Sequence, residues 1–83
     1  MITSEMAEGL ALVALVRAVR QYPGFGAELV ARRGGSAFAE ITRTEPVRHT
    51  CARVIVYRRH FLSPWGMTPT VDLEALVAAV TCE

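Results

Sequence analysis

A run of six residues, Ala52 to Tyr57, constrains the fold of this chain more than any other stretch. It is rich in β-branched and aromatic residues, which favour extended backbone. Apolar side chains occupy its even positions, whereas its odd positions mix apolar residues with the charge of Arg53. This alternation is typical of a strand that is covered on one face only. The run therefore predicts the central strand of a sheet with one buried face and one open face.

A first helix is predicted over residues 4–21. A threonine-serine pair supplies its N-cap, apolar residues follow at helical spacing, and Pro23 ends the pattern. Two further apolar residues, Leu12 and Leu15, widen the apolar stripe beyond what one sheet face needs. This helix is therefore either covered by the terminal helix or used to bind a partner.

The segment between this helix and the central strand predicts a hairpin, because short β-like runs lie on both sides of Gly34-Gly35. A two-residue loop would place Leu29 opposite Glu40. A three-residue loop would place Leu29 opposite Ile41, which separates apolar from polar side chains better. The second register is the expected one.

Beyond the central strand, the charges of Arg58, Arg59 and His60 would fall on both faces, so the strand is expected to end or bulge there. Residues 63–66 predict a turn. A second helix is expected from Thr68 as its cap, with Pro69 at its first position. Its buried stripe is expected at Leu73, Leu76, Val77 and Val80.

These patterns together predict one α+β domain over residues 1–83, with the order α-β-β-β-α. In this fold, two helices cover one face of a three-stranded antiparallel sheet. The chain has 83 residues, of which 52% are hydrophobic, so some apolar surface is expected to remain for a protein partner or a homodimer. The apolar run from Gly9 to Val16 is too short to span a bilayer, and no basic leader precedes it. A cytoplasmic protein without a membrane partner is expected.

Two cysteines, Cys51 and Cys82, lie far apart in the sequence and match no metal-ligand or redox spacing. Buried free thiols are therefore expected, since a disulfide between them would need an oxidising compartment. No motif implies a metal or a nucleotide cofactor.

The charges are unevenly distributed. All nine basic residues are arginine, and residues 17–60 contain them all against three glutamates, a balance of +6. Both ends of the chain are acidic. If the middle segment forms the sheet, the sheet side should attract an anionic partner. GC-rich coding would explain the preference for arginine over lysine equally well.

The order of elements and three stretches of sequence resemble the HicA-type toxins, which share their shape with double-stranded RNA-binding domains. These stretches are Gly24-Phe25, residues 29–36 and residues 54–56. The resemblance implies the α-β-β-β-α fold and, in that family, cleavage of messenger RNA by a histidine directly after Gly-Ser. Here Ala37 follows Gly35-Ser36, so the resemblance extends to the fold and not to the chemistry.

Candidates for chemistry are few. His49 and His60 could transfer protons, and the candidate nucleophiles, judged by their sequence surroundings, are Cys51, Ser36 and Ser63. A dyad of His49 and Cys51 is formally available, but such pairs arise by chance so often that structural roles are favoured. No catalytic residue is therefore assigned, and His60 is a better candidate for phosphate contact.

The favoured function is a small non-catalytic module that binds nucleic acid, RNA more than DNA, with an arginine-rich sheet face. One alternative is a protein-binding inhibitor or accessory protein from a phage or another mobile element, docked on an acidic or nucleic-acid-binding protein. A second alternative is a HicA-type ribonuclease toxin. Cross-strand pairing of the arginines with Glu28, Glu40 and Glu45 is the plain structural alternative. The predicted contact residues are Arg32, Arg33, Arg53, Arg58, Arg59, His60, Phe38, Tyr57 and Trp65.

Overall fold

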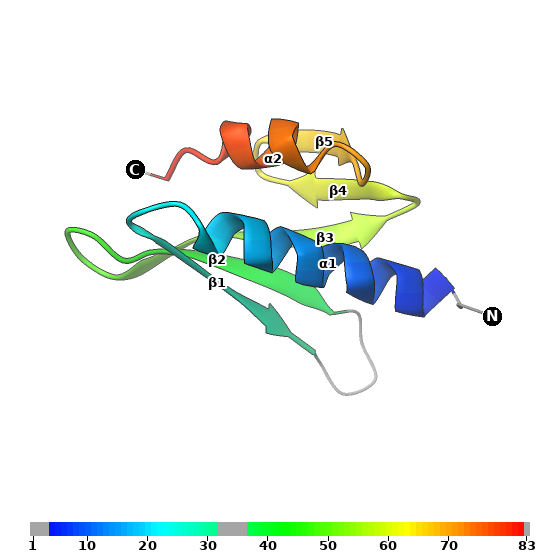
Figure 1. Cartoon of the computed structure of the whole chain (residues 1–83), viewed down its shortest axis with the longest axis horizontal. Coiled ribbons are helices and arrows are strands. Elements are labelled where there is room, and N and C mark those ends of the chain that lie inside the picture. Colours follow the sequence, from blue (N-terminus) through cyan, green and yellow to red (C-terminus); the bar gives the residue numbers. More distant parts are fainter. Residues whose placement is uncertain (1–3, 32–36, 83) are drawn as a thin grey trace.

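A computed structural model of the chain describes residues 4–31 and 37–82, which form two helices and five strands (Figure 1). The predicted α+β class is confirmed. In chain order the elements are α1 (Ser4–Arg20), β1 (Phe25–Val30), β2 (Phe38–Arg43), β3 (His49–Tyr57), β4 (His60–Ser63), β5 (Gly66–Pro69) and α2 (Leu73–Ala79).

The strands form one antiparallel sheet of five strands in the order β1-β2-β3-β4-β5, so the expected three-stranded sheet is wrong in its strand count. The first additional strand follows a two-residue turn, in which Tyr57 is opposite His60. Arg58 and Arg59 form this turn with φ angles of 48° and 62°. Tight hairpin turns with positive φ usually contain Asn or Gly, so a pair of arginines does not signal one.

A second tight hairpin joins β4 to β5 and confirms the predicted turn at residues 63–66. Ser63 Oγ donates a hydrogen bond to the Gly66 carbonyl at 3.1 Å and accepts one from the Trp65 backbone N–H at 3.3 Å. Gly66 has a φ of 124°, a conformation that few other residues adopt. The turn therefore returns the chain to the sheet instead of leading into a helix.

The expected start of the last helix at Thr68 and Pro69 is wrong, because both residues lie in β5 at the edge of the sheet. Proline is tolerated there, since an edge strand does not need every N–H. The helix begins at Leu73 instead. Its N-cap is Asp72, whose carboxylate accepts a hydrogen bond from the Ala75 N–H at 3.2 Å.

Both helices cover the same face of the sheet, as predicted, and the core lies between them and the strands (Figure 1). Leu12 and Leu15 are 2% and 0% exposed, so the wide stripe of α1 is buried within the domain and is not available to a partner. Of the predicted stripe of α2, Leu76 and Val77 are buried. The remaining core residues are Val16, Val19, Ala27, Ala39, Ile41, Val54, Phe61 and Cys82.

The β1–β2 register differs from both expected registers. Leu29 is opposite Ala39, and Val30 is opposite Phe38. The shift relative to the expected pairing with Ile41 is an even number of residues. Side chains therefore keep the expected faces. Ala39 and Ile41 are buried under the helices, whereas Glu28 and Glu40 lie on the opposite face.

The β2–β3 pairing contains a bulge at Cys51. Ile41 is opposite Ala52 but Thr42 is opposite Thr50, so Cys51 has no partner in the register. Cys51 consequently packs against the core on the helix side, not on the open face with Arg53 as the alternation predicted. It forms a disulfide with Cys82, with 5.3 Å between the Cα atoms, so the expectation of two free thiols is wrong.

None of the helices in the described ranges is both long enough and apolar enough to cross a membrane.

Candidate binding surface

The face of the sheet opposite the helices, called the outer face here, carries an apolar row that crosses all five strands. Val30 is opposite Phe38, and Ile55 is opposite Leu62, which in turn is opposite Met67. The pairing of Ala39 with Val54 places Phe38 beside Ile55 and completes the row. Residues directly opposite one another share a face, so these five side chains form one band, called the outer row.

The outer row is most open over β4 and β5. Phe38 is only 8% exposed, whereas Leu62 is 38% and Met67 is 56% exposed. The Arg53 guanidinium lies 5.4 Å from the centroid of the Phe38 ring, a distance at which a cation and an aromatic face attract. The accessible apolar part of the row is therefore aliphatic and not aromatic.

Charged residues of both signs flank the outer row on the side of β1 and β2. Glu28 and Glu40 lie directly opposite each other, an arrangement that disfavours pairing of these strands. Arg53 is opposite Glu40, and its Nε lies 3.4 Å from Glu40 Oε2. One arginine thus offsets part of the repulsion between two glutamates, which confirms one case of the cross-strand pairing expected from the sequence.

The β3–β4 turn flanks the other side of the row. Arg58 lies over Tyr57, with its guanidinium carbon 5.3 Å from the ring centroid. His60 Nδ1 lies 2.9 Å from the Arg58 carbonyl, and because a carbonyl only accepts, this nitrogen is the donor. Left-handed backbone costs a residue other than glycine roughly 1–2 kcal/mol, so these two contacts offset part of the strain of the turn.

The half of the sheet formed by β3, β4 and β5 has a positive charge. From Pro46 to Val71 the sequence contains four arginines and neither aspartate nor glutamate. Three of these arginines, Arg53, Arg58 and Arg59, belong to β3 or to the turn after it. The most open part of the outer row therefore lies in the basic half of the molecule.

The structure brings some of the predicted contact residues together and separates others. Phe38, Arg53 and Tyr57 lie on the outer face, with Arg58, Arg59 and His60 at its edge. Trp65 packs against the core and does not join them. Arg32 and Arg33 lie outside the described residues.

Four members of the outer row were missed as site residues: Val30, Ile55, Leu62 and Met67. The available signal was the alternation after the turn, in which Phe61 is buried while both of its neighbours face outward. The strands β4 and β5 have four residues each, which is too short for the alternation to be recognised by itself.

Two other arginines have structural contacts. Arg20 Nε donates to the Ala27 carbonyl of β1 at 2.8 Å. Arg43 Nε donates to the Glu45 carbonyl at 2.8 Å, and its second nitrogen donates to the Cys82 carbonyl. These arginines stabilise strand edges and the C-terminal segment, and neither belongs to the outer face.

The candidates for catalysis are not assembled into an active site among the described residues. In the same part of the chain, no group of three His, Cys, Asp or Glu side chains could hold a metal ion. Ser63 is engaged in its turn. His49 Nε2 lies 4.0 Å from Cys51 Sγ, but that sulfur is in the disulfide. Ser36 lies outside the described residues.

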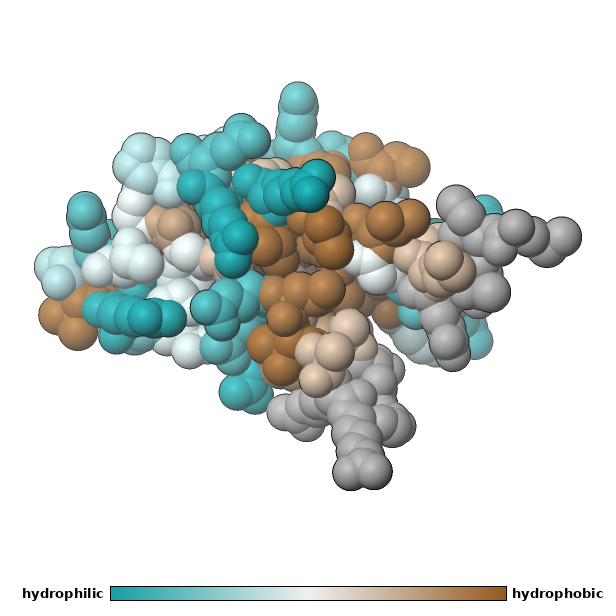
Figure 2. Space-filling view, turned by 60° about the horizontal axis from the view of Figure 1, so that its bottom comes forward, coloured by the Kyte–Doolittle hydropathy of each residue, from teal (hydrophilic) through white to brown (hydrophobic). Residues whose placement is uncertain are grey.

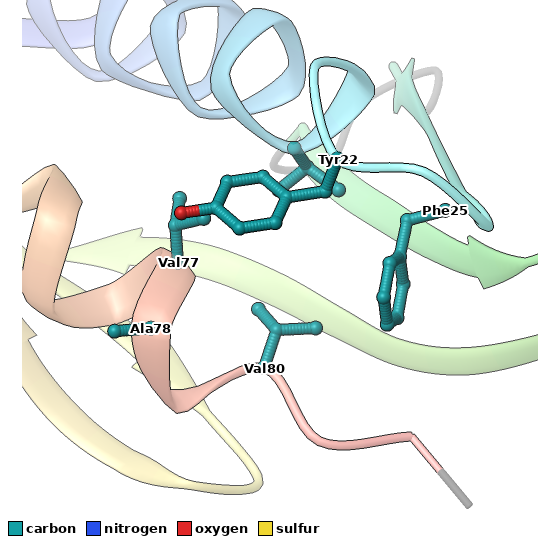
Figure 3. A pocket seen from close by; sticks show the side chains of 6 residues that line it. Tyr22, Phe25, Val77, Ala78 and Val80 are labelled. Carbon is teal, nitrogen blue, oxygen red and sulfur yellow. The ribbon is translucent and has the colours of Figure 1, made fainter.

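A small hollow lies between the C-terminal end of α1 and α2 (Figure 3). Its volume is about 120 Å³, and its lining consists of Val19, Tyr22, Phe25, Val77, Ala78 and Val80. The Tyr22 ring extends from the end of α1 toward α2. Small-molecule sites usually measure about 300–1,000 Å³, so this hollow would hold a single side chain and not a cofactor.

Apolar surface is also exposed away from the outer row. In the view that brings the β1 edge forward, hydrophobic residues gather near the centre and hydrophilic side chains border them (Figure 2). Leu10 of α1 is 58% exposed and Leu29 of β1 is 41% exposed. The high hydrophobic fraction of the sequence is thus only partly used by the core.

Comparison with known proteins gives no match to a family model, to a curated protein or to a solved structure.

Proposed function

We propose that the protein is a small non-catalytic binding module whose outer face docks on another protein with an apolar and acidic contact surface. The observation that carries this proposal is the position of the outer row. Its open end, Leu62 and Met67, lies in the half of the sheet formed by β3, β4 and β5, which with its β3–β4 turn has three arginines and no carboxylate side chain. An acidic partner would be attracted by these arginines and would bury the apolar side chains beside them.

The kind of apolar surface favours a protein over a nucleic acid. Proteins that bind single strands offer exposed aromatic rings on which bases stack. Phe38 is buried, Trp65 packs on the core, and Tyr57 is 49% exposed with Arg58 against its ring. Leucine and methionine cannot stack with bases but are suited to adaptable protein contacts, methionine in particular.

RNA binding is the second candidate, and the β3–β4 turn is the observation that favours it. Arg58 and Arg59 are adjacent, exposed and next to the accessible ring of Tyr57. Two guanidinium groups beside an aromatic ring can contact a phosphate backbone and one base. This candidate would use the turn alone, whereas docking of a protein would use the turn and the outer row.

Site-specific photo-crosslinking would test the proposal. A photoreactive amino acid would replace Leu62 in one variant and Val47 in a control, since Val47 is 70% exposed but lies between β2 and β3. In a nuclease-treated extract of the source cells, position 62 should give one discrete adduct with a peptide rich in acidic and apolar residues. Position 47 should give none.

Two outcomes would contradict docking on a different protein. Adducts at position 62 only with a second copy of the chain would indicate a homodimer. Absence of an adduct, together with binding of labelled RNA that weakens steeply with salt and is lost in the Arg58→Ala, Arg59→Ala variant, would favour RNA instead.

A further inference from the structure

The two cysteines of the disulfide differ in burial. Cys51 is half-buried at the bulge of β3, whereas Cys82, after α2, is 8% exposed. The bond joins the sheet to the last described residue of the chain, and Figure 1 shows the C-terminal segment leaving α2 for the end of the sheet where β3 begins. A reagent from solution would therefore meet the Cys51 sulfur first.

A histidine lies beside the sulfur of Cys51, the less buried of the two cysteines. His49 Nδ1 lies 3.0 Å from the Val47 carbonyl and His49 Nε2 lies 4.0 Å from Cys51 Sγ. Because the carbonyl can only accept, Nδ1 carries the hydrogen of the neutral ring and Nε2 has a free lone pair. The lone pair faces the sulfur, so it can accept the S–H proton of Cys51 once the disulfide is open.

We propose that Cys51–Cys82 is a thiol-exchange site at which His49 activates Cys51, with a low-molecular-weight thiol as the co-reactant. This inference is independent of the docking proposed for the outer face. It rests on three structural facts: Cys51 lies half-buried at the bulge, Cys82 is buried, and the His49 ring has Nδ1 near the Val47 carbonyl and Nε2 near Cys51 Sγ.

The exchange takes place in two steps. A thiolate attacks Cys51 Sγ, the bond to Cys82 breaks, and Cys82 retains the electron pair and takes a proton from solvent. A second thiolate then attacks the sulfur of the first thiol in the mixed disulfide and releases Cys51 as a thiolate. Two thiols are oxidised to one disulfide, and the protein disulfide is reduced to two cysteines. His49 Nε2 takes one of the two protons that the attacking thiols gave up to solvent, so Cys51 stays a thiolate beside it.

Opening the bond would loosen the C-terminal end of the domain. The helix α2 has seven residues, of which only Leu76 and Val77 are buried. Beyond it, Cys82 belongs to the core, and its carbonyl accepts from Arg43. Reduction therefore removes the covalent part of the attachment and leaves the Arg43 hydrogen bond and a small apolar contact.

Alkylation of the reduced protein by iodoacetamide, followed by mass spectrometry of each cysteine, would test the proposal. At neutral pH, Cys51 should react about tenfold faster than Cys82, and about tenfold faster than either cysteine in urea, because a thiolate paired with histidine is the reactive form. In His49→Gln, the Cys51 rate should fall to that in urea, while His60→Gln should leave it unchanged. Incubation of the oxidised protein with glutathione should give a mixed disulfide at Cys51 and none at Cys82.

A second variant keeps the test informative if reduction alters the fold. Cys82→Ser has a free Cys51 without any reductant, and its circular dichroism shows whether it is folded. Fast alkylation in this variant that depends on His49 would support the proposal. Equal rates for Cys51 and Cys82 in the reduced protein, no effect of His49→Gln, or a bond that glutathione opens only in urea would overturn it.

Discussion

At the scale of single residues, the clearest feature is how strongly the two faces of β3 differ. Val54 is completely buried, whereas Arg53, next to it in the chain, lies on the outer face with its side chain 61% exposed. Neighbouring positions of this strand therefore differ in whether they tolerate a charged side chain. A charge on the core face would have no partner, while a charge on the outer face is already present.

Substitution of Val54 by aspartate should unfold the domain. The variant would bury a carboxylate without a partner, at a cost of several kcal/mol, which is comparable to the total stability of a small domain. Thermal unfolding followed by circular dichroism would measure the loss. Val71→Asp is the matched control, since Val71 is 93% exposed and should change the melting temperature little. A Val54→Asp variant that melts like the parent would contradict the assignment of the core face.

The β3–β4 turn should be stabilised by turn residues of the usual kind. Replacing Arg58 by Asn and Arg59 by Gly removes two left-handed arginines, so the free energy of unfolding should rise by about 1 kcal/mol. Urea unfolding would measure the gain. A decrease would mean that the contacts of Arg58 with Tyr57 and His60 outweigh the backbone strain. The same variant should bind a partner less well if the turn arginines are contacts.

At the scale of elements, the two C-terminal strands and α2 are delimited by two local signals, a tight turn and a helix N-cap. The hairpin from Ser63 to Gly66 has a serine that makes two hydrogen bonds and a glycine with positive φ. The helix begins one residue after a typical N-cap aspartate. These signals decide where α2 begins, four residues after the proline that the sequence offered as its start.

Removal of the N-cap of α2 should destabilise the domain measurably. Asp72→Ala leaves the Ala75 N–H without its side-chain acceptor and should lower the free energy of unfolding by about 1 kcal/mol. Glu74→Ala is the control, because Glu74 is exposed and does not cap the helix. Equal unfolding midpoints in urea for the two variants would argue against Asp72 as the cap.

At the scale of the whole molecule, the disulfide joins elements that are otherwise connected by a small area of packing. Cys51 and Cys82 are 31 residues apart, and the bond closes β4, β5 and α2 into a loop on the sheet. Structural disulfides persist mainly in oxidising compartments. The cytoplasmic location expected from the sequence stays a prediction, and the redox state of this pair in cells would test it.

Loss of the disulfide should lower the stability of the domain substantially. A loop of this length contributes about 3–4 kcal/mol in the chain-entropy account, so reduction should lower the urea midpoint clearly. Comparison of the oxidised and reduced protein by urea unfolding would measure the difference. The Cys51→Ser, Cys82→Ser double variant, unfolded with and without the reductant, controls for effects of the reductant itself. Coincident curves for oxidised and reduced protein would show that the bond does not constrain the unfolded chain.

The chain is expected to lack the ribonuclease activity of HicA-type toxins. Ala37 occupies the position after Gly35-Ser36 where that family has its histidine. Expression in a bacterium should therefore leave growth unaffected, and the purified protein should leave RNA intact. Growth arrest with RNA decay that disappears in His49→Ala or His60→Ala would overturn this expectation.

The sequence by itself determined α1, the position of β3, the end of β3 near Arg58, and the burial of both helices on one face of the sheet. The helix and the strand follow from a local period, because helices and strands place apolar residues at fixed spacings. The strand was expected to end where charges fall on both of its faces, and its single apolar face indicated the side that the helices cover. Arg53, Tyr57 and the turn residues were also predicted as surface candidates, since arginine and tyrosine are residue types that often contact partners. Phe38 was predicted with them but is only 8% exposed.

Only the tertiary structure decided the strand count, the bulge at Cys51 and the outer row. The pair Arg58-Arg59 forms a turn because Tyr57 and His60 meet across a hairpin, although arginine does not favour its backbone. The row from Val30 to Met67 depends on four registers at once, and no local period contains that information. Cys51 has no partner in the β2–β3 register, and its side chain lies on the helix side of the sheet. There it meets Cys82, which is 31 residues later in the sequence.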